Sequence, residues 1–232
     1  MNLTLKEDAI FIADSHYNKK NQEFKDILEK IDKNDLTVSQ IFLMGDNFDF
    51  LCNEVTYFKN INQDIINLLN RLSNRFEIFY LEGNHDYNLS KLFPKIKVIK
   101  RENQPLILNY ENKKIALSHG DNFINWKYDL YCKIIRNSIF LRFLNIIDIK
   151  FFISKKIENS LENKNICHTL GHFEELVNKR ATKYNEDIII EGHYHQGKRY
   201  EFGEKAYINI PSLCCQKSFT RFKNETFFNE NL

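Results

Sequence analysis

The sequence predicts an α/β fold in which mostly parallel strands alternate with helices. Five apolar runs have the length of a strand, and each is followed at once by polar residues. Between the early runs, apolar residues recur at the i, i+3, i+4, i+7 spacing of a helix that packs one face on a core. The order strand, helix, strand, helix, strand builds βαβ units, which indicate a parallel sheet.

The predicted elements follow one another along the chain. Strands are expected at residues 9–13, 41–44, 78–81, 115–117 and 188–190. The early runs lack polar alternation, so these strands should be covered on both faces. Helices are expected at 24–31 and 61–72, where the apolar residues share one face.

Length and composition favour one domain spanning residues 1–232. The chain is 43% hydrophobic and 28% charged, an ordinary globular balance. Its net charge of +2 argues against wholesale nucleic-acid binding, so no nucleic-acid partner is expected. The first eight residues include Lys6, Glu7 and Asp8 and lack a long apolar stretch, so no signal peptide is expected.

The five cysteines are scattered and odd in number, without a C-x-x-C pair. This pattern predicts reduced thiols in a cytosolic protein and not a disulfide framework. Cys214 and Cys215 are expected to form a small buried pair.

Polar side chains that can bind metal follow all five predicted strands. In βαβ sheets, ligands bind beyond the carboxyl ends of the strands, so these side chains should converge on one site. The candidate metal ligands are Asp14, His16, Asp46, Asn84, His119, His193 and His195.

The converging residues supply imidazoles, carboxylates and an amide oxygen but no thiolate. This mixture suits Mn²⁺ first, with Fe or Zn²⁺ as alternatives. Seven ligands exceed the need of one ion, whereas two ions that share a carboxylate would use them all. Two metal ions ~3.5–4 Å apart clamp the attacking and leaving oxygens of an in-line phosphoryl displacement and acidify a bound water.

The five motifs, taken in order, resemble those of the calcineurin-like metallophosphoesterases. They are Asp14-x-His16, Gly45-Asp46-x-x-Asp49, Gly83-Asn84-His85-Asp86, His119 and Gly192-His193-x-His195. The resemblance covers residues 12–196 and implies a four-layer α/β/β/α sandwich. It implies that Asp14, His16, Asp46 and His195 hold one ion, and that Asp46, Asn84, His119 and His193 hold the other.

The same resemblance implies that His85 is a catalytic residue and not a ligand. It would face the phosphoryl oxygens and protonate the leaving group, with the Asp49 carboxylate orienting it and raising its pKa. Asp86 and Asp121 are expected to bond to loop amides. His168, His172 and Glu175 have i, i+4, i+7 spacing on an expected helix, where a solvated face is favoured over a third metal site.

Residues 123–165 form an expected helical insertion within the domain. From Phe123 to Glu158 there is no Gly or Pro, large apolar residues abound, and seven basic residues stand against three acidic ones. The charges exclude a membrane-spanning helix and favour a basic, amphipathic helical pair. It either completes the core as a hairpin or forms a lid that holds acyl chains and docks on an anionic membrane surface.

The insertion is loosely similar to that of the UDP-2,3-diacylglucosamine pyrophosphatases of lipid A biosynthesis. The similarity rests on Tyr128, Tyr131 and Arg136-Asn137, and it makes Tyr128 and Arg136 candidate substrate-binding residues. It implies a lipid-linked nucleotide substrate, cleaved to UMP and 2,3-diacylglucosamine 1-phosphate, and a cytoplasmic location peripheral on the inner membrane. The best-known branch of that subfamily has Arg where this chain has His85.

Two other functions are compatible with the sequence. A soluble metallophosphatase would act on phosphoproteins or dinucleoside polyphosphates, but a soluble substrate has no need of the apolar insertion. A catalytically inactive scaffold would usually have lost ligands or the catalytic histidine, whereas all seven ligands and His85 are present here.

Overall fold

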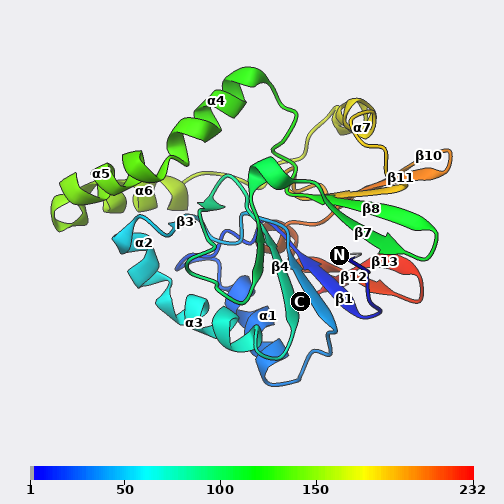
Figure 1. The fold of residues 1–232 in the computed structure, drawn as a ribbon, viewed down its shortest axis with the longest axis horizontal. Helices are drawn as coiled ribbons and strands as arrows, with labels where there is room; N and C mark the ends of the chain where they lie inside the picture. The colour runs from blue at the N-terminus through cyan, green and yellow to red at the C-terminus, as the bar shows by residue number, and fades with distance from the viewer. Residues whose placement is uncertain (1–2) are drawn as a thin grey trace.

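Two β-sheets packed face to face form the centre of the protein, which the computed structural model describes over residues 3–232 (Figure 1). The larger sheet has the order β13 (Thr226–Asn231), β12 (Ser218–Lys223), β1 (Ala9–Ile12), β2 (Gln40–Leu43), β4 (Glu77–Leu81), β6 (Lys97–Ile99). The smaller sheet has the order β10 (Arg199–Phe202), β11 (Lys205–Asn209), β9 (Ile188–Glu191), β8 (Lys113–Ser118), β7 (Leu106–Tyr110). A separate two-stranded pair joins β3 (Leu51–Cys52) to β5 (Asp86–Tyr87).

Apolar side chains from both sheets fill the space between them. Phe11, Phe42 and Phe79 come from β1, β2 and β4, and their rings stack at centroid distances of 4.8 and 5.0 Å. Ile190 and Ile208 meet this layer from the smaller sheet. Because successive strand residues point to opposite faces, the neighbouring residues of β1, β2 and β4 face outward, toward helices.

Helices cover the outer face of each sheet. On the larger sheet, α1 (Glu23–Asp32), α3 (Gln63–Leu72) and the short α8 (Leu213–Gln216) share a buried cluster with outward-facing strand residues. On the smaller sheet, α7 (Phe173–Ala181) packs Phe173 and Val177 against Ala116, Ile189 and Tyr207. The layers are therefore α, β, β, α, which confirms the predicted sandwich.

The five predicted strands are present as β1, β2, β4, β8 and β9. The pairs β1–β2, β2–β4 and β8–β9 are parallel, so their carboxyl ends lie at a common edge. The helix predicted at 24–31 is α1. The one predicted at 61–72 is instead α2 (Thr56–Ile61) followed by α3, separated at Asn62, whose side chain donates to the Phe58 carbonyl.

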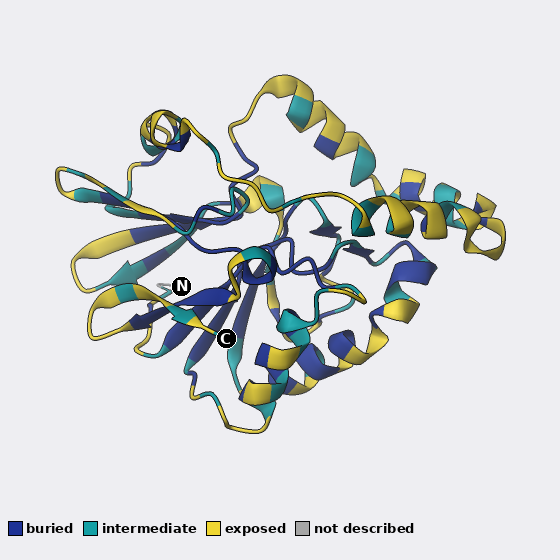
Figure 2. Ribbon diagram, turned by 180° about the vertical axis from the view of Figure 1, so that it is seen from behind, coloured by how far each residue is buried: buried dark blue, intermediate teal, exposed yellow. Residues whose placement is uncertain are grey.

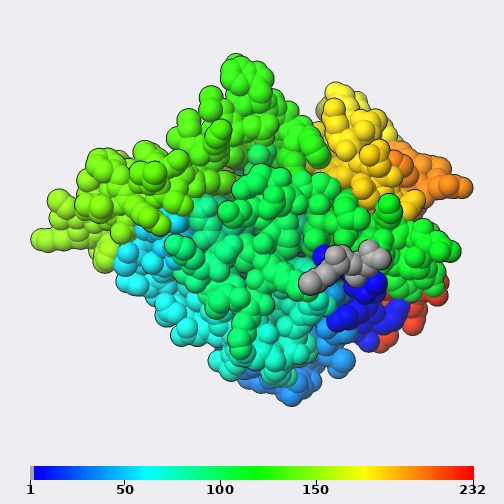
Figure 3. Space-filling view, in the orientation of Figure 1, coloured from blue at the N-terminus to red at the C-terminus, as the bar shows by residue number. Residues whose placement is uncertain are grey.

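Three helices follow β8 and form what we call the helical arm, residues 126–162. They are α4 (Trp126–Ile135), α5 (Ser138–Ile147) and α6 (Phe152–Glu162), and a 3₁₀ turn (Ile149–Phe151) precedes α6. The expected helical pair is thus three helices, because Lys150 and Phe151 adopt left-handed φ values of 53° and 61°. The arm extends beyond the sheets and stands out from the body of the molecule (Figures 1 and 3).

Much of the arm is exposed (Figure 2), and many of its exposed side chains are large and apolar. Ile139, Ile146 and Phe152 are 78%, 77% and 72% exposed, whereas Cys132 and Leu141 are buried. Over residues 3–232, no helix is both long enough and apolar enough to cross a membrane. A second 3₁₀ turn, Arg101–Asn103, lies beside the start of the arm.

Two expectations from the sequence are wrong. A disulfide joins Cys167 to Cys215, so the thiols are not all reduced, and only Cys214 of the expected buried pair is buried and free. The helix expected to carry His168 and His172 begins only at Phe173. Both differences have the same cause. The segment 163–172 joins α6 to α7 without forming a helix, and Cys167 within it reaches Cys215.

Candidate metal centre

The seven predicted ligands lie just beyond the carboxyl ends of the five predicted strands. Asp14 and His16 follow β1, Asp46 follows β2, and Asn84 follows β4. His119 follows β8, while His193 and His195 follow β9. Five of these residues have left-handed φ values between 42° and 63°, namely Asp14, His16, Asp46, His193 and His195. Such φ values are uncommon outside glycine, and they cluster at functional sites.

Six of the ligands form two compact clusters. One cluster contains Asp14, His16 and His195, whose ligand atoms lie within 4.8 Å of one another. Nε2 of His195 is 3.2 Å from Oδ1 of Asp14. The side chains are almost completely buried, so one carboxylate and two imidazoles, ligands that suit Mn²⁺, Fe or Zn²⁺, face one point.

The second cluster contains Asp46, His119 and His193, again with ligand atoms within 4.8 Å of one another. Nε2 of His119 lies 3.5 Å from Oδ2 of Asp46 and 3.3 Å from Oδ1 of Asn84. The amide oxygen of Asn84 therefore lies beside this cluster, and its role as a ligand stays a prediction.

Unpaired buried atoms show that the first cluster fits a cation. Within residues 3–232, both ring nitrogens of His16 are buried without a hydrogen-bond partner, and so is Oδ1 of Asp14. Buried polar atoms are normally paired, so such orphans need a ligand. A divalent cation between Asp14, His16 and His195 would satisfy Oδ1 of Asp14 and one ring nitrogen of His16, and the donor set suits it, while Nδ1 of His16 lies 3.4 Å from the Asp49 carboxylate.

Buried charges set the protonation of the second cluster. Burial, aided by nearby His119, lowers the pKa of His193 to about 4, so this imidazole is neutral and ready to ligate. Burial also acts to lower the pKa of His119, but the carboxylates of Asp46 and Asp121 outweigh it and raise the pKa to about 10. A cation that binds here would take the place of the His119 proton, which couples metal binding to proton release.

Hydrogen bonds to the outer nitrogens orient two of the histidines. Nδ1 of His119 donates to the Met44 carbonyl at 2.9 Å, and Nδ1 of His195 donates to the Ile166 carbonyl at 3.0 Å. In each case Nε2 is left for the cluster. Such outer contacts fix the tautomer and ring orientation of metal-binding histidines.

Asp86 holds two of the ligand loops together. Its carboxylate accepts hydrogen bonds from the backbone N–H groups of Asp46, Asn47 and Gly83 at 2.9, 2.7 and 3.0 Å. The hydroxyl of Tyr80 donates to it at 2.6 Å. The predicted structural role of Asp86 is confirmed, whereas Asp121 pairs with Arg101 instead of loop amides.

Gly83 leaves no room for a side chain next to Asp46. A Cβ at this position would stand 2.2 Å from Oδ1 of Asp46 and 2.6 Å from its backbone nitrogen. Gly83→Ala is therefore expected to displace Asp46 and to lower metal content and phosphodiesterase activity together by roughly 10–100-fold. Metal analysis of the purified variant and hydrolysis of an aryl phosphodiester would measure this. Gly171→Ala, where a Cβ meets nothing within 4 Å, is the matched control, and full metal content in Gly83→Ala would contradict the steric argument.

His85 is oriented by the backbone of Asp49 and not by its carboxylate. Nδ1 of His85 lies 2.6 Å from the Asp49 carbonyl oxygen. The carboxylate instead accepts from the side chain of Asn18 at 2.5 Å and lies 3.4 Å from Nδ1 of His16. The reason is the β3–β5 pairing, in which Leu51 N–H donates to the His85 carbonyl and draws the backbone of residues 49–51 alongside.

A cavity of about 330 Å³ opens over the two clusters. His16, Asp46, Asn84, His85, His193 and His195 line one side of it. Lys164, Ile166 and His168 line it from the segment 163–172. Sequence reasoning did not identify Lys164 or His168 as residues of this cavity, because no strand or helix pattern places this segment.

A second, more apolar cavity of about 480 Å³ lies beneath the helical arm. Asn84, His85 and Lys164 line both cavities, so the two adjoin. The remaining lining residues are Phe50, Tyr87, Tyr128, Tyr131, Ile135, Phe140, Leu141, Leu144, Ile157 and Leu161. Tyr128 thus lines the cavity that adjoins the metal clusters, and its role in substrate binding stays a prediction.

Arg136 lies next to the metal centre but lines a different pocket, with Glu82 and Arg101. Its Nη2 donates to the Gly83 carbonyl at 2.7 Å, and its guanidinium lies 5.3 Å from the centre of the Tyr87 ring. These contacts tie the end of α4 to the loop that carries Asn84 and His85. A role of Arg136 in substrate binding stays a prediction.

The predicted alternative of a third metal site at His168 and His172 finds no support. In the described part of the chain, neither histidine belongs to a group of three possible metal-binding side chains. His172 is exposed just before α7 and lies 3.5 Å from the exposed Glu175. His168 instead faces the metal cavity.

Comparison with known proteins agrees with the geometry. Residues 9–197 match the family model of calcineurin-like phosphoesterases. The UDP-2,3-diacylglucosamine hydrolase of Wigglesworthia glossinidia brevipalpis is 25% identical, over 86% of this chain and 84% of its own. That of Psychromonas ingrahamii is 21% identical, over 81% and 80%.

A solved structure shares the fold. A novel archaeal phosphodiesterase superposes with a TM-score of 0.50 at 13% identity, covering 97% of this chain and 99% of its own. The family match extends over all five ligand-bearing loops, from β1 to the residues after β9. The chain therefore belongs to the calcineurin-like phosphoesterase family and is a metal-dependent phosphoesterase.

Proposed function

We propose that the protein hydrolyses UDP-2,3-diacylglucosamine to UMP and 2,3-diacylglucosamine 1-phosphate. The apolar cavity under the helical arm carries this proposal, since it meets the metal cavity at Asn84, His85 and Lys164. A pyrophosphate at the metal centre could then place acyl chains against Tyr131, Leu144 and their neighbours. The names of the relatives support the same substrate.

The ligand clusters define how the chain would hold the reacting group. Asp14, His16 and His195 would hold one divalent cation, Asn84, His119 and His193 the other, and Asp46 would serve both. We propose Mn²⁺ for both positions. When bound, such a pair supplies Lewis acidity and a hydroxide at neutral pH.

His85 would act on the phosphoryl group from beside the metal clusters, in the wall of the same cavity. Because the Asp49 carbonyl can only accept, Nδ1 of His85 carries a hydrogen, and Nε2 is left for the substrate. In the protonated form, Nε2 would donate to a phosphoryl oxygen or to the leaving group. Lys164, at the junction of the two cavities, would add a positive charge beside the pyrophosphate.

A substrate comparison tests the proposal. Mn²⁺-loaded protein is assayed with UDP-2,3-diacylglucosamine, with its deacylated analogue and with an aryl phosphodiester, and products are identified by mass spectrometry. The proposal expects UMP and the lipid phosphate, with much higher kcat/KM for the acylated substrate. Equal turnover of the acylated and deacylated compounds, or turnover of the aryl diester alone, would overturn the lipid assignment. A phosphoprotein and a dinucleoside tetraphosphate complete the panel.

A charge in the apolar cavity should selectively weaken binding of the acylated substrate. Leu144→Asp is expected to raise KM for UDP-2,3-diacylglucosamine roughly tenfold or more, because burying a leucine-sized group is worth about 1.5–3 kcal/mol. Hydrolysis of the aryl diester should change little. Ile146→Asp puts the same charge on the same helix at a position that is 77% exposed and outside the cavity. It is the control for the added charge, and both variants are assayed with the substrate in detergent micelles. Equal effects in both variants would contradict an acyl site at Leu144.

We also propose that the insertion at residues 123–165, which contains the helical arm, is a lid that docks on the cytoplasmic face of the inner membrane. Exposed Ile139, Ile146 and Phe152 could enter the acyl boundary, and exposed basic residues such as Arg142 and Lys155 could meet anionic headgroups. Vesicles containing anionic phospholipid should sediment the protein, and high salt or Ile146→Asp should release it. Equal binding to neutral vesicles would argue against the charge contribution.

A further inference from the structure

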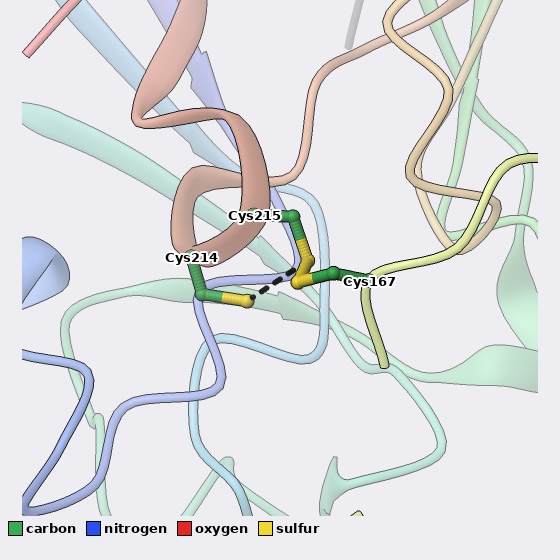
Figure 4. Close-up of side chains that lie close together, drawn as sticks. All are labelled: Cys167, Cys214 and Cys215. Carbon is green, nitrogen blue, oxygen red and sulfur yellow. Dashed lines mark hydrogen bonds between the residues drawn. A yellow bond between two sulfur atoms is a disulfide. The ribbon is translucent and has the colours of Figure 1, made fainter. Parts of the chain in front are cut away.

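A disulfide lies directly behind the metal centre and ties the segment 163–172 to α8. Cys167 belongs to this segment, and Cys215 belongs to α8, which follows β11 (Figure 4). The sulfur of Cys215 is 3.8 Å from Nδ1 of the predicted metal ligand His195. A third sulfur, that of Cys214, lies 3.5 Å from Cys215.

The tethered segment forms one wall of the metal cavity. Lys164, Ile166 and His168 line the cavity, and the Ile166 carbonyl accepts the hydrogen bond from Nδ1 of His195. The segment is otherwise weakly held, since residues 163–165 and 167–169 are exposed. Its other contacts with the body include two hydrogen bonds with the Gln196 side chain. The amide oxygen of Gln196 accepts from Leu170 N–H, and its amide nitrogen donates to the His168 carbonyl.

The two bonded cysteines differ in access from the third. Cys167 is exposed, so a thiol in solution can reach its sulfur, whereas Cys214 is buried. The disulfide is therefore open to exchange with a thiol from solution at Cys167.

We propose that Cys167 and Cys215 are a reversible redox site that sets the activity of the phosphoesterase centre. In the oxidised form the disulfide holds Ile166 on His195 and His168 in the cavity. In the reduced form the segment is released from α8, His195 loses an orienting partner, and one cavity wall opens. The proposal needs only the phosphoesterase activity and does not depend on the lipid substrate.

The exchange balances with an ordinary thiol pair. A solution thiolate attacks the Cys167 sulfur, the sulfur–sulfur bond breaks, and the Cys215 thiolate leaves and takes up a proton. A second solution thiol then releases Cys167 and forms a small-molecule disulfide. The reverse reaction uses a low-molecular-weight disulfide as oxidant, and two electrons and two protons move in each direction.

The test compares oxidised and reduced protein at constant Mn²⁺. Free thiols are alkylated and counted by mass spectrometry after treatment with glutathione disulfide or with a phosphine reductant, and aryl phosphodiester hydrolysis and metal content are measured on the same samples. We expect two fewer alkylated cysteines in the oxidised protein. We expect kcat/KM to fall roughly tenfold on reduction and to recover on oxidation, the scale for losing an outer contact of a metal-binding histidine.

Three variants separate the redox site from side effects. Cys167→Ser and Cys215→Ser should have the low activity of the reduced protein and no response to reductant, so any remaining response measures chelation by the reagent. Cys214→Ser should keep both the disulfide and the response. The proposal is overturned if no Cys167–Cys215 peptide is found after oxidation, if the wild type is equally active in both states, or if Cys214→Ser abolishes the response.

Discussion

Replacing Asp46 by asparagine is expected to lower phosphodiesterase activity by about 10³-fold or more and to reduce the bound metal. The carboxylate is buried beside His119 and His193, and the nearby His119 and His85 imidazoles overcome the effect of burial and hold its pKa well below the ordinary 3.8. An amide in its place removes the charge that both cations would share. Metal stabilisation of a phosphoryl transition state is worth several kcal/mol, and about 1.4 kcal/mol is a factor of ten in rate.

Metal analysis after equilibrium dialysis against Mn²⁺, together with steady-state kinetics, measures this effect. Asp64→Asn is the matched control, because that carboxylate is exposed on α3 and its side chain lies 3.4 Å from Lys25. Circular dichroism would show that Asp46→Asn is folded. A folded variant that keeps two ions per chain would refute the shared role of Asp46.

His85→Ala is expected to show the opposite combination, with metal retained and turnover lost. No ligand cluster in residues 3–232 includes the His85 imidazole, and its Nδ1 contacts the Asp49 carbonyl at 2.6 Å. Removal of a positioned proton donor should lower kcat roughly 10²-fold or more, with the metal content unchanged. The loss should be largest for substrates whose leaving group needs a proton.

Two aryl substrates with leaving groups of different acidity provide the measurement. His85→Ala should be least impaired with the more acidic leaving group, while the wild type should discriminate less between them. His172→Ala, which removes an exposed histidine of similar size, is the control. If His85→Ala loses metal, the residue is a ligand and its assigned role is wrong.

The strand-end ligands were predictable because two signals coincide there. The buried runs of β1, β2, β4, β8 and β9 are continuous and apolar, and each ends at a polar group whose chemistry is distinctive. The partner of His85 was not predictable in the same way. It depends on β3 and β5, which are two residues each and have no periodicity to read.

Features that depend on contacts distant in sequence were also missed. Cys167 and Cys215 are 48 residues apart, and only the folded chain brings the segment 163–172 over α8.

The break between α5 and α6 is a local feature that the sequence also does not reveal. It arises at Lys150 and Phe151, residue types that fit a helix equally well. Nearby, the Asp148 carboxylate accepts from Ile153 N–H at 2.7 Å and starts the next helix, a contact that composition does not reveal.

The left-handed backbone at five ligand positions limits how this centre can change by mutation. Asp, Asn and His tolerate this conformation better than most residues, whereas β-branched residues do not. The same short list supplies the oxygen and nitrogen donors that a divalent cation needs. A lineage that abandoned metal binding would thus keep Asp or His at positions 14, 46 and 193, or replace them with Asn or Gly, long after the ions were gone. After catalytic activity was lost, the residue types in these loops would therefore still indicate the former metal site.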